Sequence, residues 1–237
     1  MKELSRYILA FFYPEYCPYC SALIEPDDIA CTDCGREVVA RSSVIRRGVL
    51  GSRCVAPYAY EGRVRKAIIN FKFHEMTQHA RPLSKVLEDT VLKEYDVDEI
   101  DLITYVPMHK KDLLERGFNQ SELLAKELSE SLHIPYAGVL EKIKHTKKQH
   151  RLKMAKRKEN LSGAFALKDK EAIKGKTILL IDDVMTSGST LSHCVKKLYS
   201  AKPARVFCAV IASAAEHERK PKKASDPKDS DHTPGFL

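Results

Sequence analysis

The sequence contains no apolar run of about 18 residues, so we expect no membrane-spanning helix in it. The apolar stretch from Leu4 to Tyr13 is too short to cross a bilayer, and no small-residue cleavage site follows it. The Gly-x-x-x-x-Gly-Lys-Ser/Thr motif is missing, and no strand is followed by Gly-x-Gly-x-x-Gly, which argues against a P-loop and against a dinucleotide site. The lack of a membrane span and of a signal-peptide cleavage site predicts a soluble, cytoplasmic protein.

Composition favours a folded domain with a polyanionic ligand. A chain of 237 residues with 43% hydrophobic residues suits one domain of ordinary size plus a small appendage. The formal net charge of +8 favours ligands such as nucleic acid, acidic lipid surfaces or pyrophosphate. Charge alone does not choose among these.

Four of the seven cysteines have the spacing of a metal site. Cys17-x-x-Cys20 and Cys31-x-x-Cys34 are separated by ten residues, and two such pairs bring four thiolates into a tetrahedron. A rubredoxin-like iron site shares this spacing, but zinc is favoured because nothing else in the chain indicates electron transfer. Two disulfides in a secreted protein are the other alternative. The remaining cysteines are expected to be buried small apolar side chains. They are Cys54, Cys194 and Cys208.

The order of apolar segments predicts three regions. Residues 1–56 should form an N-terminal helix and the metal module, 57–213 an α/β domain, and 214–237 a disordered tail that is rich in Lys, Pro, Asp and Ser. Strands are expected at 55–60, 102–106, 139–143, 164–167, 178–183 and 206–211, and helices at 64–71, 81–94, 121–132 and 191–199. This alternation predicts a doubly wound, mostly parallel sheet.

The segment 178–190 carries the clearest chemical pattern. A buried apolar strand that starts at Ile178 ends in Asp182 and Asp183, and a small hydroxyl and glycine loop follows. The loop consists of Thr186, Ser187, Gly188, Ser189 and Thr190. Because a helix follows, its backbone N–H groups and dipole can hold a phosphate, while the carboxylates can accept hydrogen bonds from vicinal hydroxyls. The segment predicts a sugar-phosphate site.

Two basic segments supply cations. The segment 107–120 follows a strand on the side of the hydroxyl loop, and Lys110, Lys111 and Arg116 could neutralise a pyrophosphate there. Gly117 would then permit a tight turn, whereas the plainer interpretation is a solvated basic loop capped by Asn119.

The segment 142–158 contains many basic residues and no acidic one. Either it is a lid over pyrophosphate, or it tracks nucleic-acid phosphates, or it is a plain surface segment. The absence of interleaved aromatic residues weakens the case for a single-strand groove. The candidates for the lid or the nucleic-acid surface are Lys147, Lys148, Arg151 and Arg157.

The string Ile178–Thr190 resembles the PRPP-binding signature of type I phosphoribosyltransferases. With the cysteine pairs, and with Glu115-Arg116-Gly117-Phe118-Asn119-Gln120 as the most telling segment, the chain resembles the ComF family over about residues 17–212. One departure is His145, where the family often has Arg. The resemblance implies a zinc finger joined to a type I phosphoribosyltransferase fold, and a link to DNA uptake in natural transformation.

The resemblance also implies the roles of the site residues. Asp182, Asp183 and the 186–190 loop would bind PRPP with Mg²⁺, and Lys110, Lys111 and Arg116 would hold the pyrophosphate. The candidate catalytic residues are Asp182, Asp183, Lys110 and Arg116. Two functions follow as hypotheses: ribosyl 5-phosphate transfer from PRPP to an acceptor, or non-catalytic sensing of a phosphoribosyl ligand by a module that binds single-stranded DNA or DNA-uptake proteins.

Overall fold

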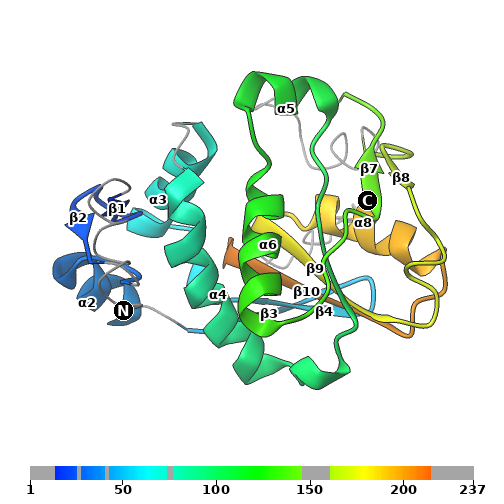
Figure 1. Ribbon diagram of the computed structural model, residues 1–237, viewed down its shortest axis with the longest axis horizontal. Coiled ribbons are helices and arrows are strands. Elements are labelled where there is room, and N and C mark those ends of the chain that lie inside the picture. Colours follow the sequence, from blue (N-terminus) through cyan, green and yellow to red (C-terminus); the bar gives the residue numbers. More distant parts are fainter. Residues whose placement is uncertain (1–13, 26–27, 41–42, 74–76, 146–160, 215–237) are drawn as a thin grey trace, which may run out of the picture.

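The computed structural model describes residues 14–25, 28–40, 43–73, 77–145 and 161–214, which form a small N-terminal module beside a larger α/β part (Figure 1). The module contains β1 (Glu15–Tyr16), β2 (Leu23–Ile24) and α2 (Thr32–Ala40). The strands of the larger part are β3 (Ile45–Val49), β4 (Ser52–Ala56), β5 (Tyr58–Ala59), β6 (Leu102–Tyr105), β7 (Leu140–Lys142), β8 (Phe165–Leu167), β9 (Thr177–Met185) and β10 (Arg205–Ser213). Its α-helices are α3 (Gly62–Phe73), α4 (Ala80–Glu94), α5 (Lys110–Arg116), α6 (Gln120–Leu132) and α8 (Ser189–Tyr199), with 3₁₀ turns η1 (Thr77–His79) and η2 (Val97–Glu99).

A six-stranded sheet forms the centre of the larger part. Its order is β3-β4-β10-β9-β6, and β5 also pairs with β10. Strands β4, β10, β9 and β6 are parallel, whereas β3 runs antiparallel to β4 at one edge. The predicted mostly parallel sheet is confirmed.

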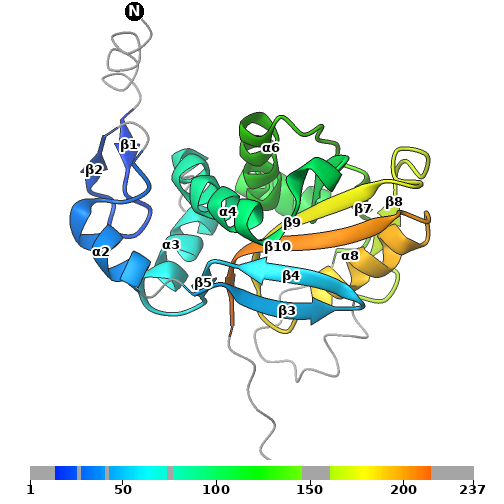
Figure 2. The same cartoon turned by 90° about the horizontal axis from the view of Figure 1, so that it is seen from below.

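The central strand β9 is buried on both faces. Ile178 and Leu180 belong to the apolar layer that includes Leu191 and Val195 of α8. Leu179 and Ile181 belong to the opposite layer, with α3, α4 and α6. Figure 2 shows α4 and α6 on one side of the sheet and α8 on the other. Because side chains alternate along a strand, a continuous apolar run is what a strand covered on both faces requires. The sheet is therefore doubly wound, as the sequence predicts.

Asn119 connects the end of β6 to the start of α6. Its Oδ1 accepts a hydrogen bond from the Ser121 backbone N–H (3.2 Å), which caps the helix. Its Nδ2 donates to the Val106 carbonyl (3.1 Å). The predicted capping role is confirmed, but the side chain is buried rather than solvated. This contact holds the first turn of α6 beside the carboxyl end of the sheet.

The module is smaller than the predicted residues 1–56. Residues 45–56 form β3 and β4 of the central sheet, so the structure divides the chain before residue 45. The reason is that β4 pairs in parallel with the central strand β10. The apolar residues of β4 are thereby buried in the core of the larger part. Contacts between Arg63 Nε and Glu37 Oε2 (2.5 Å) and between Arg81 Nη1 and Glu15 Oε1 (3.2 Å) join the module to α3 and α4.

Several predictions lie outside the described residues. They are the N-terminal helix before residue 14, the basic candidates Lys147, Lys148, Arg151 and Arg157, and the tail after residue 214. Among the helices in the described part of the chain, none combines the length and apolarity needed to cross a bilayer.

Candidate functional site

The acidic pair lies inside β9, at the point where its neighbour β6 has ended. The pairing with β6 runs from Ile178 to Ile181, whereas the pairing with β10 continues to Met185. Asp182 and Asp183 are therefore strand residues, and the strand continues beyond them to Met185 instead of ending at the acidic pair as the sequence predicts. Their carboxylates lie at the carboxyl edge of a parallel sheet, where open α/β folds bind ligands.

Asp182 is buried and held by two donors. Its Oδ1 accepts hydrogen bonds from Ser121 Oγ (2.8 Å) and from the Asp183 backbone N–H (2.9 Å). Burial, and then the neighbouring charge of Asp183, raise the pKa of Asp182 to about 7, against the opposing effect of the Ser121 hydroxyl. A carboxylate in this position is a strong acceptor once it is ionised.

Asp183 forms an ion pair with Lys72, the penultimate residue of α3. The distance from Lys72 Nζ to Asp183 Oδ2 is 2.6 Å. Burial lowers the pKa of Lys72, but the charge of Asp183 and its hydrogen bond outweigh burial, so the net pKa is raised. The sequence predicts no role for Lys72 at the site, although Lys72-Phe73 is part of the resemblance to the ComF family. The partner of Lys72 cannot be predicted from the sequence, because only the packing of α3 brings its ammonium to β9.

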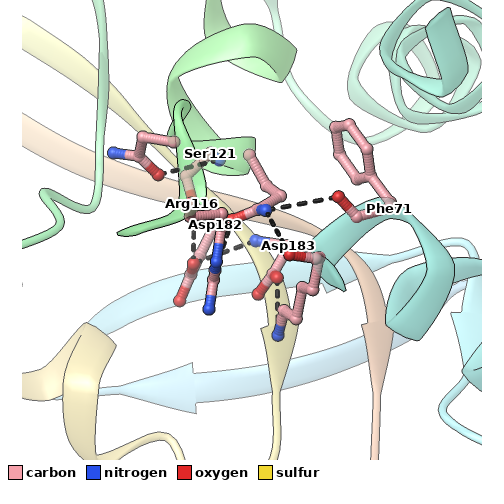
Figure 3. Close-up of polar contacts among 8 residues, drawn as sticks. Phe71, Arg116, Ser121, Asp182 and Asp183 are labelled. Carbon is pink, nitrogen blue, oxygen red and sulfur yellow. Dashed lines mark hydrogen bonds and ion pairs between the residues drawn. The ribbon is translucent and has the colours of Figure 1, made fainter. Parts of the chain in front are cut away.

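Gln120 bonds to α3 and α5 at this corner of the site, where Figure 3 shows Phe71, Arg116 and the acidic pair. Its Nε2 donates to the carbonyl oxygens of Phe71 (3.3 Å) and Lys72 (3.4 Å) at the end of α3. Its Oε1 accepts from Arg116 Nη1 (2.8 Å). One amide thus joins the end of α3 to the start of α6 and orients the guanidinium of Arg116.

The segment predicted as a basic loop forms the short helix α5. His109 Nδ1 accepts from the Lys111 backbone N–H at its start (3.2 Å), and Gly117 ends it with φ 83°, as expected for a tight turn. Arg116 lines the same open cavity as Asp182 and Asp183. Lys110 and Lys111 are exposed at the first turn of α5 and do not line this cavity. Only Arg116 of the three predicted cations is therefore in direct reach of a ligand there.

A further cation, Lys142, comes from β7. Its pKa is lowered by burial, although Asp112 and Asp182 oppose that effect. Beside it, His145 Nε2 lies 3.2 Å from Asp112 Oδ1. From the sequence, Lys142 is predicted only as part of the long basic segment 142–158.

The hydroxyl loop continues directly from β9 into α8. Gly188 has φ 71°, a left-handed conformation that glycine adopts without strain, and its carbonyl accepts from the Ser192 N–H (2.9 Å). Ser187 Oγ and Ser189 Oγ lie 3.0 Å apart. A small hollow is lined by the whole predicted loop, Thr186 to Thr190, together with Asp182. Hydroxyls and the N-terminal end of an eleven-residue helix surround it, which suits a phosphate.

One open cavity of about 370 Å³ joins these groups. Its charged lining residues are Lys72, Asp112, Arg116, Lys142, Asp182 and Asp183, and Thr186 and Thr190 bring the hydroxyl loop to its edge. The structure thus gathers the acidic pair, a third carboxylate from Asp112, three cations and a phosphate-type loop. Sequence reasoning found the acidic pair and the loop but only one of the cations.

The four predicted metal ligands also meet. The Sγ atoms of Cys17, Cys20, Cys31 and Cys34 all lie within 4.8 Å of one another, and the Cys20–Cys31 separation is 3.6 Å. A tetrahedral zinc with Zn–S bonds of about 2.3 Å needs sulfur atoms about 3.8 Å apart, so the set fits zinc. All four are free thiols, which disagrees with the disulfide alternative.

The remaining cysteines are small side chains within the core. Cys54, Cys194 and Cys208 are buried and are also free thiols. Burial raises the pKa of each. The prediction of buried apolar residues is confirmed.

Comparisons with known proteins identify the domain. The model of the family described as "Phosphoribosyl transferase domain" matches residues 119–233. The DNA utilization protein YhgH of Escherichia coli (strain K12) is 29% identical over 215 residues, which cover 86% of this chain and 94% of that protein. Competence protein F of Haemophilus influenzae is 34% identical over 136 residues, 55% of this chain and 59% of that protein.

Two more matches extend this comparison. Competence protein ComFC of Bacillus subtilis (strain 168) is 28% identical over 184 residues, 77% of this chain and 70% of that protein. Among solved structures, purine phosphoribosyltransferase from Pyrococcus horikoshii aligns with a TM-score of 0.36 and 17% identity, over 56% of this chain and 72% of that one. Similarity to competence and DNA utilization proteins, together with the matching domain model, supports the assignment of this chain to the ComF family, and the matched domain has a phosphoribosyltransferase fold.

Proposed function

We propose that the cavity binds PRPP, or a related ribose phosphate, together with Mg²⁺, and transfers its ribosyl 5-phosphate to an acceptor. The observation that carries this proposal is the meeting of the hydroxyl loop, the acidic pair and the cations Lys72, Arg116 and Lys142 around one cavity. A phosphorylated sugar with a second anionic group would complement these residues, because its phosphate, hydroxyls and second anion each find a partner among them.

Each part of the ligand has a matching group. The 5-phosphate fits the 186–190 loop, because hydroxyls and backbone N–H groups donate there without bulk. The ribose hydroxyls would donate to Asp182 and Asp183, whose oxygens are the acceptors next to the loop. The acidic pair lies in β9, and the loop follows the same strand. The 5-phosphate of one sugar can therefore bind to the loop while its ribose hydroxyls bind to the acidic pair.

The pyrophosphate would lie toward Arg116 and Lys142. Arg116 offers a forked donor that is already oriented by Gln120, and Lys142 adds a charge from β7. Lys110 and Lys111, which the sequence analysis placed in contact with pyrophosphate, keep only a long-range electrostatic role in the proposal, because they are exposed outside the cavity.

The carboxylates of Asp182 and Asp183 also fit Mg²⁺, a hard cation that takes oxygen ligands. When bound, Mg²⁺ would neutralise charge on the pyrophosphate. Lys72 already neutralises part of the charge of the acidic pair through Asp183, so the ion would share that carboxylate with an ammonium.

Transfer would break the bond between the anomeric carbon and pyrophosphate and form a bond from that carbon to the acceptor. Positive charge develops on the ribose as the leaving group departs, so nearby carboxylates stabilise the transition state and cations stabilise the leaving group. Asp182, Asp183 and Arg116 are the residues that this chain places for these roles.

The relatives' names suggest where this chemistry is used. Proteins named for competence and for DNA utilization lead us to propose a role in DNA uptake, with single-stranded DNA or DNA-uptake proteins as partners. We propose that the protein acts in the cytoplasm, where thiols such as the four metal-site cysteines stay reduced.

Ligand binding is tested with Asp183→Asn. Loss of a charged acceptor for a ribose hydroxyl should weaken Mg²⁺–PRPP binding by about 10- to 100-fold in calorimetry. Glu171→Gln, which removes one exposed carboxylate outside the cavity, is the matched control and should bind as wild type does. Equal affinity of wild type and Asp183→Asn would contradict the site.

Transfer is tested separately from binding. Incubation with PRPP, Mg²⁺ and a panel of bases should release pyrophosphate at a rate that depends on the acceptor, and Arg116→Met should slow the release. Tight PRPP binding without release for any acceptor would disprove transfer and favour a phosphoribosyl sensor.

The raised pKa of Asp182 predicts a pH-dependent stability. Its folded pKa of about 7 exceeds the ordinary value of 3.8, so the folded state holds this proton more tightly than the unfolded state. The stabilisation is present at low pH and is lost as pH rises through about 7. Relative to Asp182→Asn, the ligand-free wild type should lose up to roughly 4 kcal/mol of unfolding free energy between pH 4 and pH 8. Parallel pH profiles of the two proteins would contradict this.

The cysteine cluster predicts a resident metal. Elemental analysis of freshly purified protein should find about one zinc per chain, and a chelator should lower the melting temperature, because metal binding contributes to folding of a small module. Cys34→Ser should reproduce the loss, whereas Cys194→Ser should keep the zinc. A zinc and iron content far below one per chain would contradict the metal site.

A further inference from the structure

Arg47 contacts the hydroxyl loop from an unexpected direction. It lies on the edge strand β3, in the stretch that the sequence analysis assigned to the appendage. Its Nη1 donates to the Thr186 carbonyl (3.0 Å), to Ser213 Oγ (3.2 Å) and to the Ala214 carbonyl (3.3 Å). No other residue of β3 has a hydrogen bond to the loop among those of the described residues.

These acceptors mark the carboxyl ends of two central strands. Thr186 is the first residue after β9 and begins the loop, whereas Ser213 ends β10. The Ala214 N–H donates to the Met185 carbonyl (2.9 Å), so the backbone itself joins the two strand ends. The guanidinium of Arg47 reaches past β4 and fastens the same junction from the sheet edge.

The contact with Thr186 constrains the next amide. The peptide bonds of the described residues are trans, and in a planar trans peptide the carbonyl and the following N–H point in opposite directions. Since the Thr186 carbonyl points to Arg47, the Ser187 N–H points away from it. Arg47 lines neither the small hollow of the loop nor the open cavity. It therefore acts on the loop from behind.

We propose that Arg47 is a positioning residue for the phosphate site, which holds the 186–190 loop in the conformation that receives a phosphate monoester. This inference rests on the proposed function, because it assigns the loop to the 5-phosphate. Arg47 also places a positive charge behind the loop, which favours a dianion in front of it.

A guanidinium suits this position better than an ammonium. Its planar group presents several N–H donors in a fixed arrangement, so it can serve the ends of two strands at once. A lysine at this position has a shorter reach and a single donor centre. We therefore expect Arg47→Lys to restore part of the function and not all of it.

The test combines two measurements on Arg47→Met, Arg47→Lys and wild type. Ribose 5-phosphate binding by calorimetry should weaken about tenfold or more in the methionine variant and by an intermediate factor in the lysine variant. Hydrogen exchange of the Ala214 amide in the ligand-free protein should become about tenfold faster in the methionine variant, while the Cys208 amide in the middle of β10 stays unchanged.

Arg205→Met is the matched control. It removes the same charge at the opposite end of β10, where Arg205 forms an exposed ion pair with Glu99, and it should alter neither measurement. Wild-type affinity of Arg47→Met for ribose 5-phosphate would overturn the proposal, whatever the exchange rate of the Ala214 amide. Arg47→Lys keeps the proposal testable if the methionine variant fails to fold, because wild-type behaviour of a folded lysine variant would also overturn it.

Binding by the wild type and by Arg47→Met distinguishes a failure of the proposed function from a failure of the role of Arg47. If wild type binds neither ribose 5-phosphate nor PRPP, the proposed function is wrong. If wild type binds and Arg47→Met binds equally well, only the role of Arg47 is wrong.

Discussion

Two adjacent carboxylates inside a buried strand are the constraint on which the rest of the site depends. A buried charge is costly unless it is paired or hydrogen-bonded, and Asp182 and Asp183 are both nearly inaccessible. Their compensation comes from separate helices, with Lys72 from α3 and Ser121 from α6. The two helices must therefore converge on the end of β9. Gln120, which bonds to the end of α3 from the start of α6, secures that convergence.

The same helix connects the site to the cysteine module. At the first turn of α3, Arg63 pairs with Glu37 and approaches Cys34 Sγ at 3.4 Å. At its last turn, Lys72 pairs with Asp183. Cysteines of the module and apolar residues of α3 also belong to one buried layer. The module thus packs against the domain through α3. The two ends of this helix contact the metal-site module and the acidic pair.

Charges of both signs line the cavity, and this combination matches a ligand with both hydroxyls and anionic groups. The carboxylates occupy the sheet edge, the hydroxyl loop lies at the start of α8, and Arg116 and Lys142 stand on the walls. Arg116 and the hydroxyl loop are each held by a residue outside the cavity or at its margin. Arg116 is oriented by Gln120, and the loop is fastened behind by Arg47. Such prior orientation lets charges act on a ligand without reorganisation.

The sequence by itself determined the features that depend on local order. The apolar run before Asp182, the small loop with Gly188 and the spacing of the cysteine pairs are visible in the chain, because strand burial, a left-handed turn and metal ligation each demand particular residues at short range. Only the tertiary structure decided that β3 and β4 belong to the main sheet, that Lys72 and Lys142 replace Lys110 and Lys111 at the cavity, and that Arg47 supports the loop. These contacts join residues far apart in sequence, and a side chain's partner across such distances is set by how the helices and strands pack, which no local pattern records.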